Sequence, residues 1–421
     1  MPQAQSVFKF ELTVSEITKL DRGINAQAST PPALCVHFDR VRGSTLRAYN
    51  CMTNSGTVSR EGGTPDSARL GVLGSKEVNH ETSLSTGSES DVRKANDIQA
   101  NPSNSKSRGS SSSSESSDGD PKPRSQLSWH TNDTRMLVSA DGTRIYANAV
   151  GDPSKQAIVF IHGFCWSLIA FDDIFEDRRW TSKLYLVRYD VRGHGRSGKP
   201  DTDAAWESKR LAEDFDAVVC AFKLCRPFVA GWSLGSAHLM DILSFHPVDY
   251  VSGIINIAGA PYVSPDMLLN IGTPFVSELI ERMTQGPTVE DFQNASEEFI
   301  RACCRTLPYE VRRKCLGSIM TQPRSMMVRS VKTREQDLST FERVGRTRVP
   351  CLVIYGEEDE LVLVRKLPGY YWGWRNAKVE VLKGGSHMPW SKTDRAVGDE
   401  FCERMLEWIE GVVRGRTLAR L

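Results

Sequence analysis

Short apolar runs alternate with amphipathic helical segments from about Arg135 onward. Ala157–Gly163, Leu184–Asp190 and Val251–Gly259 are largely apolar and end at a turn or polar residue, as strands buried on both faces do. Such strands, separated by helices, favour a parallel sheet that helices cover on both sides. The sequence therefore predicts an α/β fold. Two alternating runs around Asp141-Gly142 add a hairpin at its start.

The alternation breaks between about residues 261 and 348, where helical periodicity dominates. Thr288 and Asp291 in this stretch have the spacing of a capping box at a helix start. The strand pattern resumes at Pro350–Gly356 and Ala377–Leu382, and a last amphipathic helix follows. Because ligands of open α/β sheets bind at the carboxyl ends of the strands, we expect the helical insertion to cover the binding site.

The first 130 residues do not have the pattern of a large packed domain. Residues 51–130 are rich in Ser, Gly, Pro and charge, and we predict a disordered linker because they cannot bury enough apolar surface to offset the entropy of ordering. Within residues 1–50, Val7–Val14 and Ala33–Val41 alternate like short strands. Two short strands do not make a stable domain, so this segment either packs on the main domain, residues 131–421, or is disordered.

Charge and cysteine spacing limit the partners. The formal net charge is +1 and the basic residues form no stripe, which argues against nucleic acid. No apolar run is long enough for a membrane span and no signal peptide is evident, so we expect a cytoplasmic protein. The ten cysteines have no metal-ligand spacing, and we interpret them as free thiols. The final Ala419-Arg420-Leu421 is similar to the S-K-L peroxisomal address, which makes peroxisomal import a hypothesis.

A serine stands between two glycines where a strand pattern meets a helix pattern. Gly231-Trp232-Ser233-Leu234-Gly235 has the form G-x-S-x-G in the context that this motif requires. The glycines permit a tight turn, and the helix that begins there directs free N–H groups toward any negative charge that forms near Ser233. A serine hydroxyl is a weak nucleophile, so it needs a base and a carboxylate that orients the base.

His387 is the base that remains when the eight histidines are compared. It lies in a loop directly after the last strand pattern, which places it at the carboxyl edge of the sheet beside Ser233. The other histidines lie in the N-terminal part, too far down the helix after Ser233, or in loops that they are expected to shape: His37, His80, His130, His238, His246, His162 and His194. The neighbouring strand end offers four acids, Glu357, Glu358, Asp359 and Glu360, among which position alone does not choose.

Five motifs in this order resemble those of the α/β-hydrolase superfamily, in the branch with a helical cap. The resemblance covers about Arg135 to Val413 and predicts an α/β-hydrolase fold, with the cap at about residues 261–348, before the acid-bearing strand. The matching segments are His162-Gly163-Phe164 (oxyanion loop), Asp190–Ser197 (D-x-R-G-x-G-x-S turn), Gly231–Gly235 (nucleophile elbow), Gly356-x-x-Asp359 (acid motif) and His387 (terminal histidine).

The resemblance implies a role for each matching residue. Ser233 attacks an acyl carbonyl, His387 takes the proton and returns it to the leaving group, and Asp359 holds the imidazole in its useful tautomer. The backbone N–H groups of Leu234 and Phe164 form the oxyanion hole.

Trp232 and Cys165 are predicted to contact the substrate. Asp190, Arg192 and His194 in the glycine-rich turn are interpreted as scaffold. Neither a metal nor an organic cofactor is predicted.

The predicted function is cleavage of an ester-like bond in a small or medium-sized apolar substrate. Hydrolysis of a carbon–carbon bond in a diketone and perhydrolase chemistry on the same triad are open alternatives. A catalytically inactive relative that acts as a binding module is the competing class, although such a protein would usually have lost a triad residue. An aspartate nucleophile would imply an epoxide hydrolase or a dehalogenase, and Ser233 argues against both.

Overall fold

The computed structural model describes residues 11–12, 36–40, 46–50, 132–332 and 334–418. The whole predicted linker at residues 51–130 and the C-terminal tripeptide lie outside these residues, so what the sequence predicts for them stays a prediction.

A small antiparallel sheet is described before residue 132. Its strands, in spatial order, are β1 (Glu11–Leu12), β3 (Leu46–Asn50) and β2 (Val36–Arg40). β1 and β2 lie inside the two stretches that alternate in the sequence. β3 is not predicted, because the adjacent Ala48 and Tyr49 interrupt the alternation of apolar and polar residues.

An eight-stranded sheet organises residues 132–418, in the order β11-β10-β9-β8-β6-β7-β5-β4. Neighbouring strands from β11 to β7 are parallel, whereas β5 pairs antiparallel with β7 and with β4. The predicted hairpin and the mostly parallel sheet are both confirmed. The strands are β4 (Asp133–Val138), β5 (Arg144–Val150), β6 (Ala157–Ile161), β7 (Tyr185–Tyr189), β8 (Phe228–Trp232), β9 (Gly253–Ile257), β10 (Cys351–Gly356) and β11 (Ala377–Leu382).

The central strands are buried from end to end, which explains their apolar sequences. Every residue of β6, β8, β9 and β10 is buried. The edge strand β11 is mostly half-buried or exposed, and its Glu380 pairs with Lys378 and Arg404. Charged side chains on an edge strand are a common protection against pairing with another chain.

Helices cover both faces of this sheet. On one face, Phe160 of β6 packs against Trp180 of α3 (Arg178–Thr181), and α3 packs against α13 (Arg395–Leu418). Helices α4 (Ser208–Ala221) and α5 (His238–Phe245) pack together. The short helices are η1 (Leu168–Phe171), α2 (Asp172–Phe175), η2 (Asp203–Trp206), η3 (Ser233–Ala237), η4 (Val248–Tyr250), η5 (Val364–Lys366) and α12 (Leu367–Tyr371).

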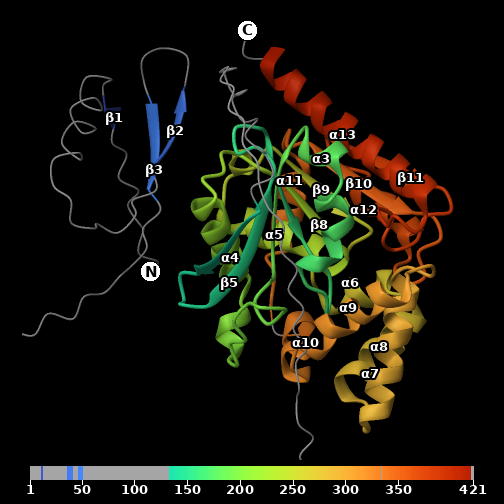
Figure 1. Ribbon diagram of the computed structural model, residues 1–421. Helices are drawn as coiled ribbons and strands as arrows, with labels where there is room; N and C mark the ends of the chain where they lie inside the picture. The colour runs from blue at the N-terminus through green and yellow to red at the C-terminus, as the bar shows by residue number, and fades with distance from the viewer. Residues whose placement is uncertain (1–10, 13–35, 41–45, 51–131, 333, 419–421) are drawn as a thin grey trace, which may run out of the picture. The chain divides into compact units, whose positions relative to one another are not determined.

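Six helices fill the chain between β9 and β10, where the sequence predicts a helical cap. In Figure 1, α7, α8, α9 and α10 lie together at one end of the sheet, whereas α11 packs against α5. Their bounds are α6 (Pro265–Ile271), α7 (Pro274–Gln285), α8 (Val289–Cys303), α9 (Tyr309–Met320), α10 (Arg324–Lys332) and α11 (Ser339–Gly345).

Only half of the predicted capping box forms at the start of α8. The Thr288 hydroxyl accepts a hydrogen bond of 3.0 Å from the backbone N–H of Asp291. The Asp291 carboxylate accepts from Arg282 of α7 instead of reaching back to Thr288, because a charged partner is available there. Over the residues described, every helix is too short or too polar to cross a bilayer.

Candidate active site

Ser233 follows β8 directly and has a backbone φ of +55°, in the left-handed region that non-glycine residues rarely adopt. The glycines on either side make this turn possible. A Cβ at Gly231 would collide with the backbone of Gly235 and Ser236, and a Cβ at Gly235 would collide with the carbonyl oxygens of Ile161 and His162 at the end of β6. The turn therefore holds Ser233 in a strained conformation at the carboxyl edge of the sheet, as strand-to-helix turns with a nucleophile do.

Asp359 and His387 form a buried pair on the loops after β10 and β11. The Asp359 carboxylate oxygen Oδ2 lies 2.6 Å from Nδ1 of His387, and the side chains are 0% and 1% exposed. The other carboxylate oxygen accepts the backbone N–H groups of Leu361 and Val362, each at 2.9 Å. Both oxygens are thus occupied, which fixes the orientation of the carboxylate toward the imidazole.

The three neighbouring acids point away from this pair. Glu358 and Glu360 pair with Arg305, which follows α8, and both are more than a third exposed. Glu357 is also exposed and lies 3.9 Å from Arg365. Among the four acids that the sequence offers, the structure brings Asp359 to His387.

The His387 loop is held by backbone contacts from three directions. The indole N–H of Trp232 donates to the His387 carbonyl at 2.8 Å. The backbone N–H of Met388 donates to the carbonyl of Cys303 at the end of α8, at 3.1 Å. The backbone N–H of Glu358 donates to Gly385 at 2.8 Å, which ties this loop to the acid loop. The imidazole is therefore placed by the β8, cap and β10 segments together.

The link between Ser233 and His387 is open in this structure. Within the described part of the chain, the Ser233 hydroxyl makes no hydrogen bond. The two residues are neighbours through Trp232, whose indole ring centroid lies 5.3 Å from that of the His387 imidazole. Catalytic hydrogen bonds are often long in enzymes without substrate and tighten in the complex. The structure therefore contains one contact of the predicted triad, between Asp359 and His387. The contact between His387 and Ser233 is not formed.

The loop after β6 approaches the serine from the other side. A Cβ on Gly163 would lie 2.8 Å from the Cβ of Ser233, so only glycine lets the backbone come this close. His162 shapes this loop, as the sequence predicts: its Nε2 accepts the N–H of Val191 at 3.0 Å, and its Nδ1–H donates to the Gly163 carbonyl at 2.9 Å. Burial lowers the pKa of His162 well below its usual value, which keeps it neutral and suits one donor and one acceptor.

The predicted oxyanion residues follow the two residues that meet here: Leu234 follows Ser233, and Phe164 follows Gly163. Phe164 is 4% exposed, and its ring meets Phe299 of α8 with centroids 6.1 Å apart. Leu234 is 8% exposed and lines a small pocket with Gly163.

Trp232 and Cys165, which the sequence predicts as substrate contacts, are both fully buried. The Trp232 ring packs on Trp166 and Trp390, and its indole N–H is used by the His387 loop. Cys165 has a φ of +60°, and burial raises the pKa of its thiol well above the usual value. These contacts favour a supporting role for both residues over contact with the substrate.

The contacts of the glycine-rich turn after β7 favour the scaffold role that its sequence predicts. The Asp190 carboxylate accepts the backbone N–H groups of Leu168 and Arg196, at 2.7 and 2.8 Å. Arg192 is fully buried and pairs with Asp214 at 2.6 Å. These contacts join the turn to its neighbouring loops and bury the charges of Asp190 and Arg192.

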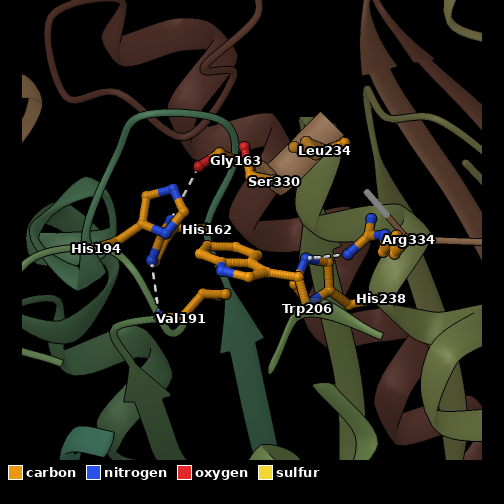
Figure 2. Close-up of a pocket in the computed structure, with 9 residues that line it drawn as sticks. All are labelled: His162, Gly163, Val191, His194, Trp206, Leu234, His238, Ser330 and Arg334. Carbon is orange, nitrogen blue, oxygen red and sulfur yellow. Dashed lines mark hydrogen bonds between the residues drawn. The ribbon is translucent and has the colours of Figure 1, made fainter. Parts of the chain in front are cut away.

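A small polar pocket beside the serine was not predicted. Figure 2 shows three histidines around it, with His162 and His194 on one side and His238 with Arg334 on the other. It has room for about one water molecule. Sequence reasoning missed it because Arg334 belongs to no motif and comes from the segment after α10. The pocket is lined by His162, Gly163, Val191, His194, Trp206, Leu234, His238, Ser330 and Arg334.

Buried hydrogen bonds connect this pocket to the cap. His194 Nδ1 contacts the Arg192 carbonyl at 3.0 Å, and Nε2 contacts the side-chain amide of Gln322 at 2.8 Å. Burial lowers the pKa of His194 to about 4. Arg334 Nη1 donates to Nε2 of His238 at 3.0 Å, and burial next to this guanidinium lowers the pKa of His238 well below its usual value.

Comparison with known proteins agrees with this fold. The protein named "Probable oxidoreductase EphD" of Mycobacterium tuberculosis is 36% identical over 86 residues, which are 20% of this chain and only 14% of that protein. Rhodomycin D methylesterase DauP of Streptomyces sp. is 31% identical over 104 residues, 24% of this chain and 35% of that protein. The solved esterase RhEst1 from Rhodococcus sp. is 20% identical, with a TM-score of 0.58 over 66% of this chain and 99% of that chain.

The family model described as "Alpha/beta hydrolase family" matches residues 158–400. The match extends from β6 through the cap to the beginning of α13, and so includes the serine turn, the acid loop and the His387 loop. The chain belongs to the alpha/beta hydrolase family.

Proposed function

We propose that the protein is a serine hydrolase that cleaves an ester bond in a small or medium-sized substrate. Ser233 is the nucleophile, His387 the base and Asp359 the group that orients the base. The observation that carries this proposal is the buried 2.6 Å contact between the Asp359 carboxylate and Nδ1 of His387, on loops at the same sheet edge as Ser233. A serine that is to act as a nucleophile needs such an oriented imidazole.

In the first half of the reaction, Ser233 Oγ attacks the ester carbonyl carbon and Nε2 of His387 accepts the hydroxyl proton. The Asp359 carboxylate accepts Nδ1–H and stabilises the imidazolium that forms. The backbone N–H groups of Leu234 and Phe164 bind the oxyanion, each contributing about 3 kcal/mol to the lowering of the barrier. When the tetrahedral intermediate collapses, the bond to the alkoxy oxygen breaks, and the alcohol leaves with the proton from His387.

In the second half, water attacks the acyl group on Ser233 while His387 accepts its proton. Collapse of the second intermediate releases the carboxylic acid and returns the proton to Ser233 Oγ. Ester and water become acid and alcohol, with no other reactant. The printed names of the methylesterase DauP and the esterase RhEst1 support an ester as substrate.

A fluorophosphonate probe tests the nucleophile directly. We expect the folded full-length protein to be labelled on Ser233 and the Ser233→Ala variant to remain unlabelled. Ser182→Ala, which removes an exposed hydroxyl in the turn after α3, is the matched control and should be labelled like the natural protein. No label on Ser233 in folded protein would contradict the proposal and favour a binding module.

A substrate panel tests the bond that is cleaved. Purified protein should hydrolyse simple esters, and Ser233→Ala should lose this activity by at least about a thousandfold, because the triad acts as a unit. The panel includes lactones, amides and diketones. Turnover of a diketone without turnover of any ester would overturn the ester assignment.

A further inference from the structure

Two residues of the small pocket carry buried hydrogen-bond donors that lack an acceptor. Arg334 and His238 are each 5% exposed. The Arg334 guanidinium donates from Nη1 to His238, and the same nitrogen lies 3.2 Å from Oδ2 of Asp241. Its Nε and Nη2, and Nδ1 of His238, have no hydrogen-bond partner among the residues that the structure describes. Unpaired buried donors are rare in folded proteins.

All of these free atoms are donors. Nε2 of His238 accepts a hydrogen bond from Arg334, so the hydrogen of the neutral imidazole is on Nδ1. A guanidinium has donors only. What the pocket lacks is therefore a hydrogen-bond acceptor. A metal ion does not fit, because the described residues include no group of three or more histidine, cysteine or acidic side chains that could hold one.

The charge of the pocket favours an acceptor without a charge of its own. Asp241 already balances Arg334, and its Oδ1 accepts from Ser208 and Gln336 at 2.6 and 2.7 Å. A second carboxylate would leave one buried negative charge without a counter-ion, which is costly in a low-dielectric interior. The space also suits one oxygen atom better than the two of a carboxylate, because it has room for about one water molecule.

The position of the pocket connects it to the substrate. Its wall includes Gly163, which approaches Ser233, and Leu234, whose N–H belongs to the proposed oxyanion hole (Figure 2). The cap also contributes to the wall, through Ser330 and Arg334. A group in this pocket would therefore lie near the reacting carbonyl carbon, beside the proposed oxyanion hole.

We propose that Arg334 and His238 bind an uncharged acceptor oxygen, a ketone or amide carbonyl, in the acyl part of the substrate. This inference rests on the proposed function and narrows it: the preferred substrates are oxo-acyl esters and not plain alkyl esters. Arg334 and His238 determine specificity in this arrangement and take no part in the bond cleavage.

Matched methyl esters test the preference. Methyl 3-oxobutanoate, 4-oxopentanoate and 5-oxohexanoate are compared with methyl butanoate, pentanoate and hexanoate. Each kcat/KM is divided by the rate constant for alkaline hydrolysis of the same ester, which removes differences in intrinsic reactivity. We expect at least about a tenfold preference for the oxo ester at one chain length or more, because a site built for a hydrogen bond rejects the analogue without it. Equal or lower values for all three oxo esters would overturn the inference.

Monomethyl glutarate tests the charge argument. We expect its corrected kcat/KM to fall below that of the best oxo ester, because Asp241 already supplies the negative charge. A higher value for the carboxylate would overturn the assignment of an uncharged acceptor.

The double variant Arg334→Gln with Asp241→Asn tests the residues. It removes both charges of the buried pair together, so that neither is left without its partner. We expect the ratio of oxo to alkyl kcat/KM to fall to about one. Arg301→Gln, which changes an exposed arginine of the cap helix α8, should keep the ratio of the natural protein. A double variant that folds and keeps the preference would contradict the role of Arg334.

A binding measurement distinguishes this inference from the proposed function. Calorimetric titration of the Ser233→Ala protein with methyl 5-oxohexanoate and methyl hexanoate, and with the shorter pairs, requires no catalysis. If an oxo ester binds more tightly than the matching alkyl ester and the double variant loses this difference, the result supports the binding role of the pocket. This holds even if no ester is hydrolysed. Hydrolysis of alkyl esters that depends on Ser233, without any oxo preference in kinetics or binding, would retain the function and overturn the inference.

Discussion

Burial distinguishes Asp359 from the acids beside it. Its two carboxylate oxygens are fully used, one by the His387 imidazole and one by two backbone N–H groups. Glu358 and Glu360 are exposed and pair with the same guanidinium, that of Arg305. Exposed pairs of this kind contribute little to stability, so these acids should be replaceable where Asp359 is not.

Replacing Asp359 should therefore test whether its carboxylate orients the His387 imidazole. We expect Asp359→Asn to lower kcat by about a thousandfold or more, because an amide can donate to Nδ1 and so favour the wrong tautomer of His387. Glu360→Gln, one residue away, should leave kcat within about twofold. Steady-state kinetics on a simple ester measures both, and similar losses in the two variants would contradict the assignment of Asp359.

The sequence predicts these catalytic candidates, but it does not predict the pocket beside them. Ser233 and Asp359 stand in motifs with fixed spacing, and His387 follows the last strand, so the resemblance to a family reaches each one. Arg334 and His238 are 96 positions apart, and neither stands in a motif. Their meeting depends on how the cap packs against α5, which no local pattern encodes. The half-formed capping box at Thr288 has the same cause, because Arg282 comes from another helix.

At the scale of elements, the serine turn depends on the contact between β8, η3 and the end of β6. The Ser236 hydroxyl donates to the Gly231 carbonyl at 2.6 Å, which closes the turn from inside. Gly235 packs against the carbonyl oxygens of Ile161 and His162, so the turn also touches the oxyanion loop. The apolar runs predict the strands, and the glycines predict the turn, because both are local properties of the chain.

Replacing Gly235 in the serine turn and Gly317 in helix α9 with alanine should change the free energy of unfolding in opposite directions. Gly235→Ala places a methyl group against backbone that cannot move aside, and we expect it to lower the free energy of unfolding by about 1–3 kcal/mol. Gly317→Ala lies in α9 with nothing within 4 Å of the new Cβ, and it should raise the free energy by about 0.5–1 kcal/mol. Urea unfolding of both variants measures the difference. A destabilised Gly317→Ala together with an unaffected Gly235→Ala would refute the packing argument.

At the scale of the molecule, the helical insertion contacts three loops around the candidate site. Phe299 meets Phe164 of the oxyanion loop, and the Cys303 carbonyl accepts from Met388 beside His387. Gln322 contacts His194 in the turn after β7. One insertion between β9 and β10 therefore packs against loops from β6, β7 and β11. The neutral histidines at this junction make its stability sensitive to acid.

The pKa values of His162, His194 and His238 are all lowered by burial, in the case of His194 to about 4. An unfolded histidine has a pKa near 6.5, so between about pH 6.5 and 4 the unfolded chain binds a proton that the folded protein does not. The free energy of unfolding must then fall as the pH drops through this window. For His194 alone, the loss is on the order of 3 kcal/mol, complete below about pH 4.

His194→Gln tests this contribution, because glutamine offers a donor and an acceptor and does not titrate. Urea unfolding at pH 7.5 and pH 4.5 should show a smaller loss of stability in the variant than in the natural protein, by up to about 3 kcal/mol. The buried carboxyls of Asp190, Asp214 and Asp241, whose pKa values are raised by burial, act in the opposite direction but are common to both proteins. The difference between the two proteins therefore isolates His194, and equal losses would mean that its imidazole is protonated in the folded state at pH 4.5.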